Sequence, residues 1–191
     1  MPSASLNNWR TVRRAALDEL EAAHRSVGGT ARGRRYATQQ INHAYAVILS
    51  SQFQGYCRDL HSECVGFLLQ SMPAGLLRSA LSEALVQNRK LDRGNPNPGN
   101  LGADFNRFGL KFWPEVLGLD PRSQGRQDRL AELNEWRNAI AHQDFDPAVL
   151  GSASLRVERV RGWRKACDQL AQGFDEVMRA YIQKVNGAPP W

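Results

Sequence analysis

Residues 163–181 read WRKACDQLAQGFDEVMRAY and carry the clearest structural pattern in the chain. The apolar side chains in this stretch recur at steps of four and three residues: Trp163, Cys167, Leu170, Phe174, Val177 and Tyr181. This repeat is typical of a helix that packs lengthwise against neighbouring helices. We therefore predict a long final helix whose apolar seam faces the core.

The stretch 36–70 shows a similar pattern over a greater length. Its apolar residues recur at steps of three to five, as one buried helix face requires: Ile41, Tyr45, Ile48, Phe53, Tyr56, Leu60, Cys64 and Phe67. The same periodicity predicts further helices at 6–25, 73–91, 104–112 and 123–142, the last capped by Ser123. Glycine, proline and asparagine predict loops at 93–101 and 113–125, and RGRR predicts a basic loop at 32–35.

No stretch alternates in the manner of a strand or hairpin, and no linker is long enough to separate two domains. A chain of 191 residues can bury a sizeable core. We therefore predict a single all-α domain over 1–191. Its architecture should be an antiparallel helical bundle of about five to six helices, with irregular connections between the third and the last long helix.

The composition excludes a wholly disordered chain and a membrane-spanning one. Hydrophobic residues make up 42% of the chain and charged residues 23%, and no apolar run approaches the length of a membrane span. The first residues lack the apolar core of a signal peptide, so we expect a cytoplasmic protein without membrane contact. The net charge of +6, with 21 Arg against 4 Lys, suits phosphate recognition and equally suits a solvated surface.

Cysteines and most histidines show no pattern of a metal site. The cysteines form no C-x-x-C pair and are expected to be reduced core residues: Cys57, Cys64 and Cys167. His24, His43 and His61 have no acid or cysteine at ligand spacing, so we expect structural or surface roles for them. No glycine-rich phosphate loop or hydrolase motif occurs, and the sequence predicts neither a metal nor a cofactor.

Near the end of the predicted helix 123–142 lies the hexapeptide Arg137-Asn138-Ala139-Ile140-Ala141-His142. A histidine moves protons near neutral pH, a guanidinium grips a phosphate with two donors, and an amide can orient either group. These groups supply what RNA cleavage without a metal needs. Spacing alone is weak support, because a chain of this composition places an arginine five residues before a histidine roughly 0.4 times by chance.

A helical wheel strengthens the pattern. The stripe that faces the core consists of Leu130, Leu133, Trp136 and Ile140. Arg137 lies at the edge of this stripe, whereas Asn138 and His142 point away from it, one turn apart, where they can hydrogen-bond each other. Exposed carbonyls at a helix end stabilise a protonated imidazole, which would supply an acid. The same features also fit a simple helix-capping role.

Residues 137–142 resemble the Arg-polar-x3-His signature of HEPN domains, all-helical modules found in prokaryotic toxins, phage-defence proteins and RNA-guided RNA-cleaving effectors. The surrounding long helices are loosely similar, and Arg58-Asp59-Leu60-His61 resembles the second helix of stand-alone HEPN nucleases. The resemblance implies metal-independent RNA cleavage by a dimer, leaving cyclic phosphate and 5′-hydroxyl ends. It assigns proton transfer to His142, phosphate binding to Arg137 and orientation of the site to Asn138.

We therefore expect a HEPN-like endoribonuclease, a toxin or phage-defence effector that binds RNA as a homodimer. One chain supplies one motif histidine, whereas attack by a 2′-hydroxyl needs both a base and an acid, so two copies should complete the site. An antitoxin or regulatory protein is an expected partner. HEPN toxins controlled by a nucleotidyltransferase antitoxin carry a tyrosine two residues after the histidine, and Asp144 stands there, which argues against that type of control.

Two alternatives stay open. The same fold can serve as a non-catalytic dimeric binding or scaffold module for a nucleotide or a partner protein, and the motif can be accidental in an unrelated helical scaffold. The basic start of the final helix contacts the RNA backbone or forms a solvated face: Arg156, Arg159, Arg161, Arg164 and Lys165.

Overall fold

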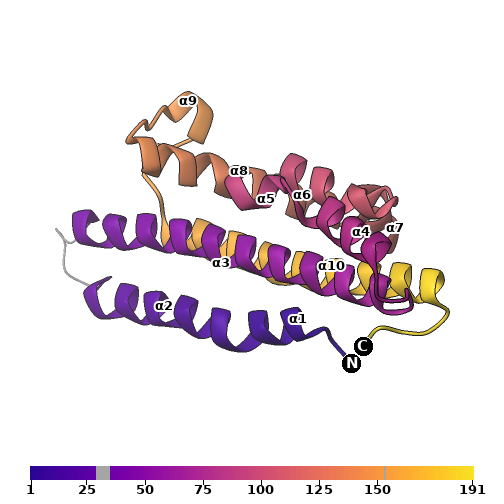
Figure 1. Cartoon of the computed structure of the whole chain (residues 1–191). Helices are drawn as coiled ribbons and strands as arrows, with labels where there is room; N and C mark the ends of the chain where they lie inside the picture. Colours follow the sequence, from indigo (N-terminus) through magenta and orange to yellow (C-terminus); the bar gives the residue numbers. More distant parts are fainter. Residues whose placement is uncertain (29–34, 153) are drawn as a thin grey trace.

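The computed structural model describes residues 1–28, 35–152 and 154–191 (Figure 1). Its helices are α1 (Ala4–Asn8), α2 (Arg14–Gly28), α3 (Arg35–Gln70), α4 (Leu76–Val86), α5 (Lys90–Arg93), α6 (Pro98–Phe105), α7 (Phe112–Leu119), α8 (Ser123–His142), α9 (Pro147–Leu150) and α10 (Val157–Asn186). A π-helical turn, Trp9–Arg13, joins α1 to α2, and a 3-10 turn, Asn106–Phe108, follows α6. The predicted basic loop at 32–35 lies outside the described residues, except for Arg35, which begins α3.

Three layers of helices make up the bundle. The two longest helices, α3 and α10, lie side by side in the middle layer, α1 and α2 cover one side, and α8 with α4 to α7 covers the other (Figure 1). Asn42 near the start of α3 bonds the carbonyl of Leu155 just before α10, and Asn186 at the end of α10 bonds Phe67. Therefore α3 and α10 run in the same direction, and α2 and α8 run antiparallel to them. The predicted all-α bundle is confirmed, and the described residues contain no strand.

The predicted seam of the final helix is the centre of the core. From Trp163 to Val177 its residues are buried, while Tyr181 is half-buried and donates a hydrogen bond to the carbonyl of Phe108. The thiols of the three cysteines are free and buried, as expected. One continuous cluster of buried side chains includes residues of α1 to α3 and of α5 to α10.

The prediction of one helix over 73–91 is wrong at both ends. The chain turns at 71–75, and α4 covers only Leu76–Val86. Two leucines of this predicted helix point into solvent: Leu76 is 90% exposed and Leu77 67% exposed. The apolar spacing favours a helix, but no described element packs over the face that carries Leu76 and Leu77.

The loop and helix predictions between 93 and 125 are also partly wrong. Asn97 caps α6 with its side chain and Pro98 occupies the first turn, where the missing N–H costs nothing, so a helix begins inside the expected loop. The helix predicted at 104–112 is interrupted by Gly109, whose φ of +87° is left-handed. Helix α7 then occupies half of the stretch expected to be irregular. Ser123 begins α8, but its hydroxyl accepts from Arg126 and caps nothing.

Candidate functional site

The motif occupies the last turns of α8. Leu130, Leu133 and Trp136 are buried against the core, as the helical wheel predicts, and Ile140 packs on the edge of the core. Asn138 and His142 are exposed, and Arg137 is half-buried beside them. The helix therefore anchors the motif through its apolar stripe and presents the polar side chains to solvent at one end of the bundle.

The end of α8 is capped without His142. Gln143 adopts the left-handed conformation, φ +57°, and its side-chain amide donates to the carbonyl of Ile140 at 2.7 Å. The N–H of Asp144 donates to the carbonyl of Ala139 at 3.0 Å. In the described part of the chain, the His142 ring makes no hydrogen bond. These contacts weigh against the helix-capping role, because the carbonyls that the ring would serve already have partners.

Asn138 connects the motif to a distant part of the sequence. Its Oδ1 accepts a hydrogen bond from Arg137 Nη1 at 3.3 Å and a second one from Asn95 Nδ2 at 2.5 Å. The guanidinium of Arg137 forms no ion pair with any described carboxylate. Its charge therefore remains available to a bound anion. Sequence reasoning missed Asn95, whose only signal was its place in the asparagine-rich loop.

Asn138 also lines a pocket of about 320 Å³. Its lining residues come from the end of α8 and from α9: Glu135, Asn138, Ala139, His142, Asp144, Asp146, Val149 and Leu150. Asn138 and His142 thus share one cavity, but Arg137 does not line it. The predicted hydrogen bond between Asn138 and His142 is absent from the described contacts, because the amide oxygen of Asn138 turns toward Arg137 and Asn95.

Carboxylates surround His142. Glu135 and Asp144 line the pocket without a hydrogen bond to another described side chain, and Asp146 uses Oδ1 to accept the N–H of Ala148 and cap α9. These negative groups repel a phosphate that enters from this side. A phosphate would be held more favourably near the guanidinium of Arg137.

Most of the basic residues at the start of α10 serve the fold. Three of the five expected residues form ion pairs with neighbouring helices: Arg159 with Glu132, Arg161 with Glu21, and Arg164 with Asp18. Among described side chains, Arg156 and Lys165 have no ion pair. The prediction of an RNA-backbone contact is therefore reduced to these two residues.

His43 and His61 are both buried, in keeping with the expected structural roles. His43 stacks on Phe145 with ring centroids 5.2 Å apart, and burial lowers its pKa. His61 lies in a polar cluster that sequence reasoning missed, with Arg89 Nη1 3.5 Å from its Nδ1 and the carbonyl of Asp104 3.2 Å from its Nε2. Burial, reinforced by the charge of Arg89, lowers the pKa of His61 to about 4. Neither ring is accessible to a large substrate.

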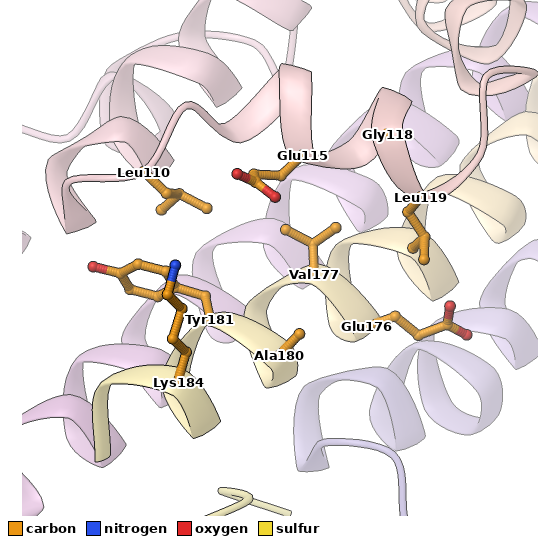
Figure 2. Close-up of a pocket in the computed structure, with 9 residues that line it drawn as sticks. All are labelled: Leu110, Glu115, Gly118, Leu119, Glu176, Val177, Ala180, Tyr181 and Lys184. Carbon is orange, nitrogen blue, oxygen red and sulfur yellow. The ribbon is translucent and has the colours of Figure 1, made fainter. Parts of the chain in front are cut away.

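A second groove, of about 310 Å³, lies between α7 and α10 (Figure 2). Val177 and Ala180 of α10 form an apolar floor, Glu115 of α7 lies above it, and Lys184 extends beside the ring of Tyr181 (Figure 2). No residue of the motif lines this groove. It therefore adds nothing to the chemistry expected at the end of α8.

Comparison with protein-family models, with curated proteins and with solved structures finds no match. Across residues 1–28, 35–152 and 154–191, no helix is long and apolar enough to span a membrane. The same residues contain no group of three or more histidine, cysteine or acidic side chains placed to hold a metal ion.

Proposed function

We propose that this protein is a metal-independent endoribonuclease of the HEPN type, a toxin or phage-defence effector that acts in the cytoplasm as a homodimer. The observation that carries the proposal is the state of the motif at the end of α8. Arg137 has no carboxylate partner in the described chain, and His142 is exposed and takes no part in capping. Asn138 bonds Arg137 and lines the same pocket as His142. Polar groups that serve neither core nor cap are available for a ligand.

In the proposed reaction, one His142 removes the proton of a ribose 2′-hydroxyl, and the 2′-oxygen attacks the adjacent phosphorus. The bond from phosphorus to the 5′-oxygen breaks, and a second, protonated imidazole donates its proton to that oxygen. The products are a 2′,3′-cyclic phosphate and a 5′-hydroxyl. Arg137 stabilises the negative charge that accumulates on the phosphate oxygens.

A second copy of the chain is required for two reasons. One motif supplies one histidine, while the reaction needs a base and an acid at the same phosphate. In addition, carboxylates line the pocket beside His142, whereas the positive charge of Arg137 lies outside this pocket. A twofold arrangement that brings two such sides together would place two guanidinium groups and two imidazoles around one phosphate.

An RNA cleavage assay in excess chelator tests the proposal. The wild type should cut RNA, and His142→Ala and Arg137→Ala should each lower the rate by at least about a hundredfold. Arg129→Ala is the matched control for Arg137, because Arg129 is an exposed arginine of α8 without an ion pair among the described residues. A His142→Ala variant that cuts as fast as the wild type would show that the assigned chemistry is wrong.

The second candidate function is a non-catalytic dimeric module that binds a partner protein or a nucleotide. The three carboxylates beside His142 favour it, because an acidic pocket with an apolar wall at Val149 and Leu150 suits a basic side chain better than a phosphate. In that case Glu135→Gln would weaken partner binding, and no RNA cleavage would be detected for the wild type. An antitoxin or other regulatory protein with a basic contact residue would be a partner of this kind.

A further inference from the structure

The loop Gly94-Asn95-Pro96-Asn97 lies directly against the motif, although 43 residues separate Asn95 from Asn138. The Nδ2 group of Asn95 donates to Oδ1 of Asn138 at 2.5 Å. Within the described chain, this is the only hydrogen bond between a motif side chain and a side chain outside α8. The loop therefore acts on the polar side chains of the motif through a direct hydrogen bond.

The loop is held in place by three neighbouring elements. From α3, Gln54 Nε2 donates to the carbonyl of Gly94 at 2.9 Å. From α8, Asn134 Nδ2 donates to the carbonyl of Pro96 at 3.3 Å. From α6, Asn100 Nδ2 donates to the carbonyl of Asn95 itself at 2.8 Å. A loop fixed from three sides can hold a side chain in one orientation, as a positioned site requires.

The loop packs so closely on α6 that Gly94 has no room for a side chain. A Cβ atom at this position would lie 2.7 Å from Nδ2 of Asn100, the group that binds the carbonyl of Asn95. Pro96 is buried between its neighbours, and Asn97 accepts the N–H of Asn100 at 2.8 Å as the cap of α6. The backbone of Asn95 is thus tied to the start of a helix.

Two donors on one oxygen decide which way the Asn138 amide faces. Asn95 and Arg137 both donate to Oδ1, so a rotated amide would place an NH2 group against two donors and lose both bonds. The NH2 group of Asn138 is therefore the free end of the amide. An NH2 group donates to a phosphate oxygen, whereas an amide oxygen in the same place would repel it.

We propose that Asn95 is a positioning residue of the ribonuclease site, which holds the Asn138 amide so that its NH2 group is free to donate to the scissile phosphate. This inference rests on the proposed function. It extends the site from one helix to two separate segments of the chain, α8 and the loop 94–97. Asn95 itself does not touch the substrate; it acts through Asn138.

Two substitutions test this role. Asn95→Ala removes the donor, and Asn95→Asp keeps the size but offers only acceptors, so the Asn138 NH2 group should turn toward the new carboxylate. We expect kcat to fall roughly tenfold for Asn95→Ala and roughly a hundredfold for Asn95→Asp, with KM nearly unchanged. Asn186→Ala is the matched control, because it removes a 2.8 Å asparagine bond to the carbonyl of Phe67 far from the motif.

A double-mutant cycle separates positioning from a structural role. In an Asn138→Ala background, Asn95→Ala should cause no further loss, because it acts only through the Asn138 amide. The side-chain NH2 resonances of Asn138 should also shift in Asn95→Ala and stay in place in Asn186→Ala. An equal loss in both backgrounds, or Asn95 variants that cut as fast as Asn186→Ala, would overturn the positioning role and leave the proposed function standing. A wild type that cuts no RNA would overturn both.

Discussion

His61 and His142 have the same side chain, and their surroundings give it opposite properties. The His61 ring is fully buried, with the rings of Phe105 and Phe108 at centroid distances of 5.4 and 4.6 Å. The cation of Arg89 lies on one side of it. His142 stands at an exposed helix end among carboxylates. A buried ring beside a cation stays neutral. Of the two rings, only that of His142 is open to a substrate.

His61 should make the stability of the protein depend on pH. Its pKa is about 4 in the folded protein against a usual value near 6.5, so the unfolded chain binds more protons between these two values. The neutral His61 ring therefore makes its full contribution to the free energy of unfolding above about pH 6.5. This contribution is lost as the pH falls toward 4. Through His61 alone, the free energy of unfolding should decrease by about 3 kcal/mol over this pH range.

Urea unfolding of the wild type and of His61→Gln between pH 4 and 7 measures this contribution. The glutamine does not titrate, so the free energy of unfolding of the variant should fall less steeply below pH 6.5. Acidic side chains titrate in both proteins, so their contributions to the free energy of unfolding cancel when the two curves are compared. Parallel curves for the two proteins would show that His61 does not titrate differently in the folded and unfolded states.

Single residues also show where sequence reasoning stops. The helical wheel correctly placed Asn138 and His142 on the exposed side of α8, because neighbours on one helix are related by a fixed angle. No such rule relates Asn138 to Asn95, since their contact depends on how the loop packs on α8. The direction in which Arg137 points was likewise decided by Asn138 Oδ1 and not by helix geometry.

Long helices were predictable and short ones were not. The bounds of α8 agree with the predicted range 123–142, and α3 begins one residue before the predicted 36–70. Over 20 residues or more, an apolar repeat is sampled many times. Helices α6 and α7 have eight residues each, too few turns for the repeat to outweigh glycine and proline. The cap at Asn97 and the proline at the first turn were the signals that marked α6.

The two glycines inside α3 provide a matched pair of substitutions. A Cβ at Gly66 meets nothing within 4 Å, so Gly66→Ala should stabilise the protein by about 1 kcal/mol through helix propensity alone. A Cβ at Gly55 would overlap the guanidinium of Arg13, which bonds Gln52 and Asp59 at 2.9 and 2.7 Å. Gly55→Ala should therefore gain less or lose stability, because Arg13 must move. Urea midpoints of the two variants measure the difference.

The guanidinium can be removed to check this explanation. In an Arg13→Ala background, Gly55→Ala should stabilise the protein about as much as Gly66→Ala does, since the three atoms nearest to the added Cβ all belong to the Arg13 guanidinium. A Gly55→Ala variant that is as stable as Gly66→Ala in the presence of Arg13 would contradict the close approach of the Arg13 side chain to α3.

Each chain has one motif, at the end of α8 beside α9 (Figure 1), and Asn138 of this motif bonds Asn95 of the loop 94–97. Proposed cleavage needs two motifs at one phosphate, so activity should depend on association of two chains. We expect the cleavage rate per mole of protein to fall on dilution through the range in which sedimentation velocity shows dimers dissociating. A monomer that cleaves at an undiminished rate would eliminate the composite site.

The sequence by itself determined the all-α class, the long helices and the exposed end of α8, because all of these follow from periodicity along one stretch of chain. Only the tertiary structure decided which apolar faces are covered, as the exposed leucines of α4 show. It also decided that Asn95 meets Asn138, that acids surround His142, and that Arg159, Arg161 and Arg164 pair with carboxylates. These contacts join residues far apart in the chain, and their distances depend on how the helices pack together.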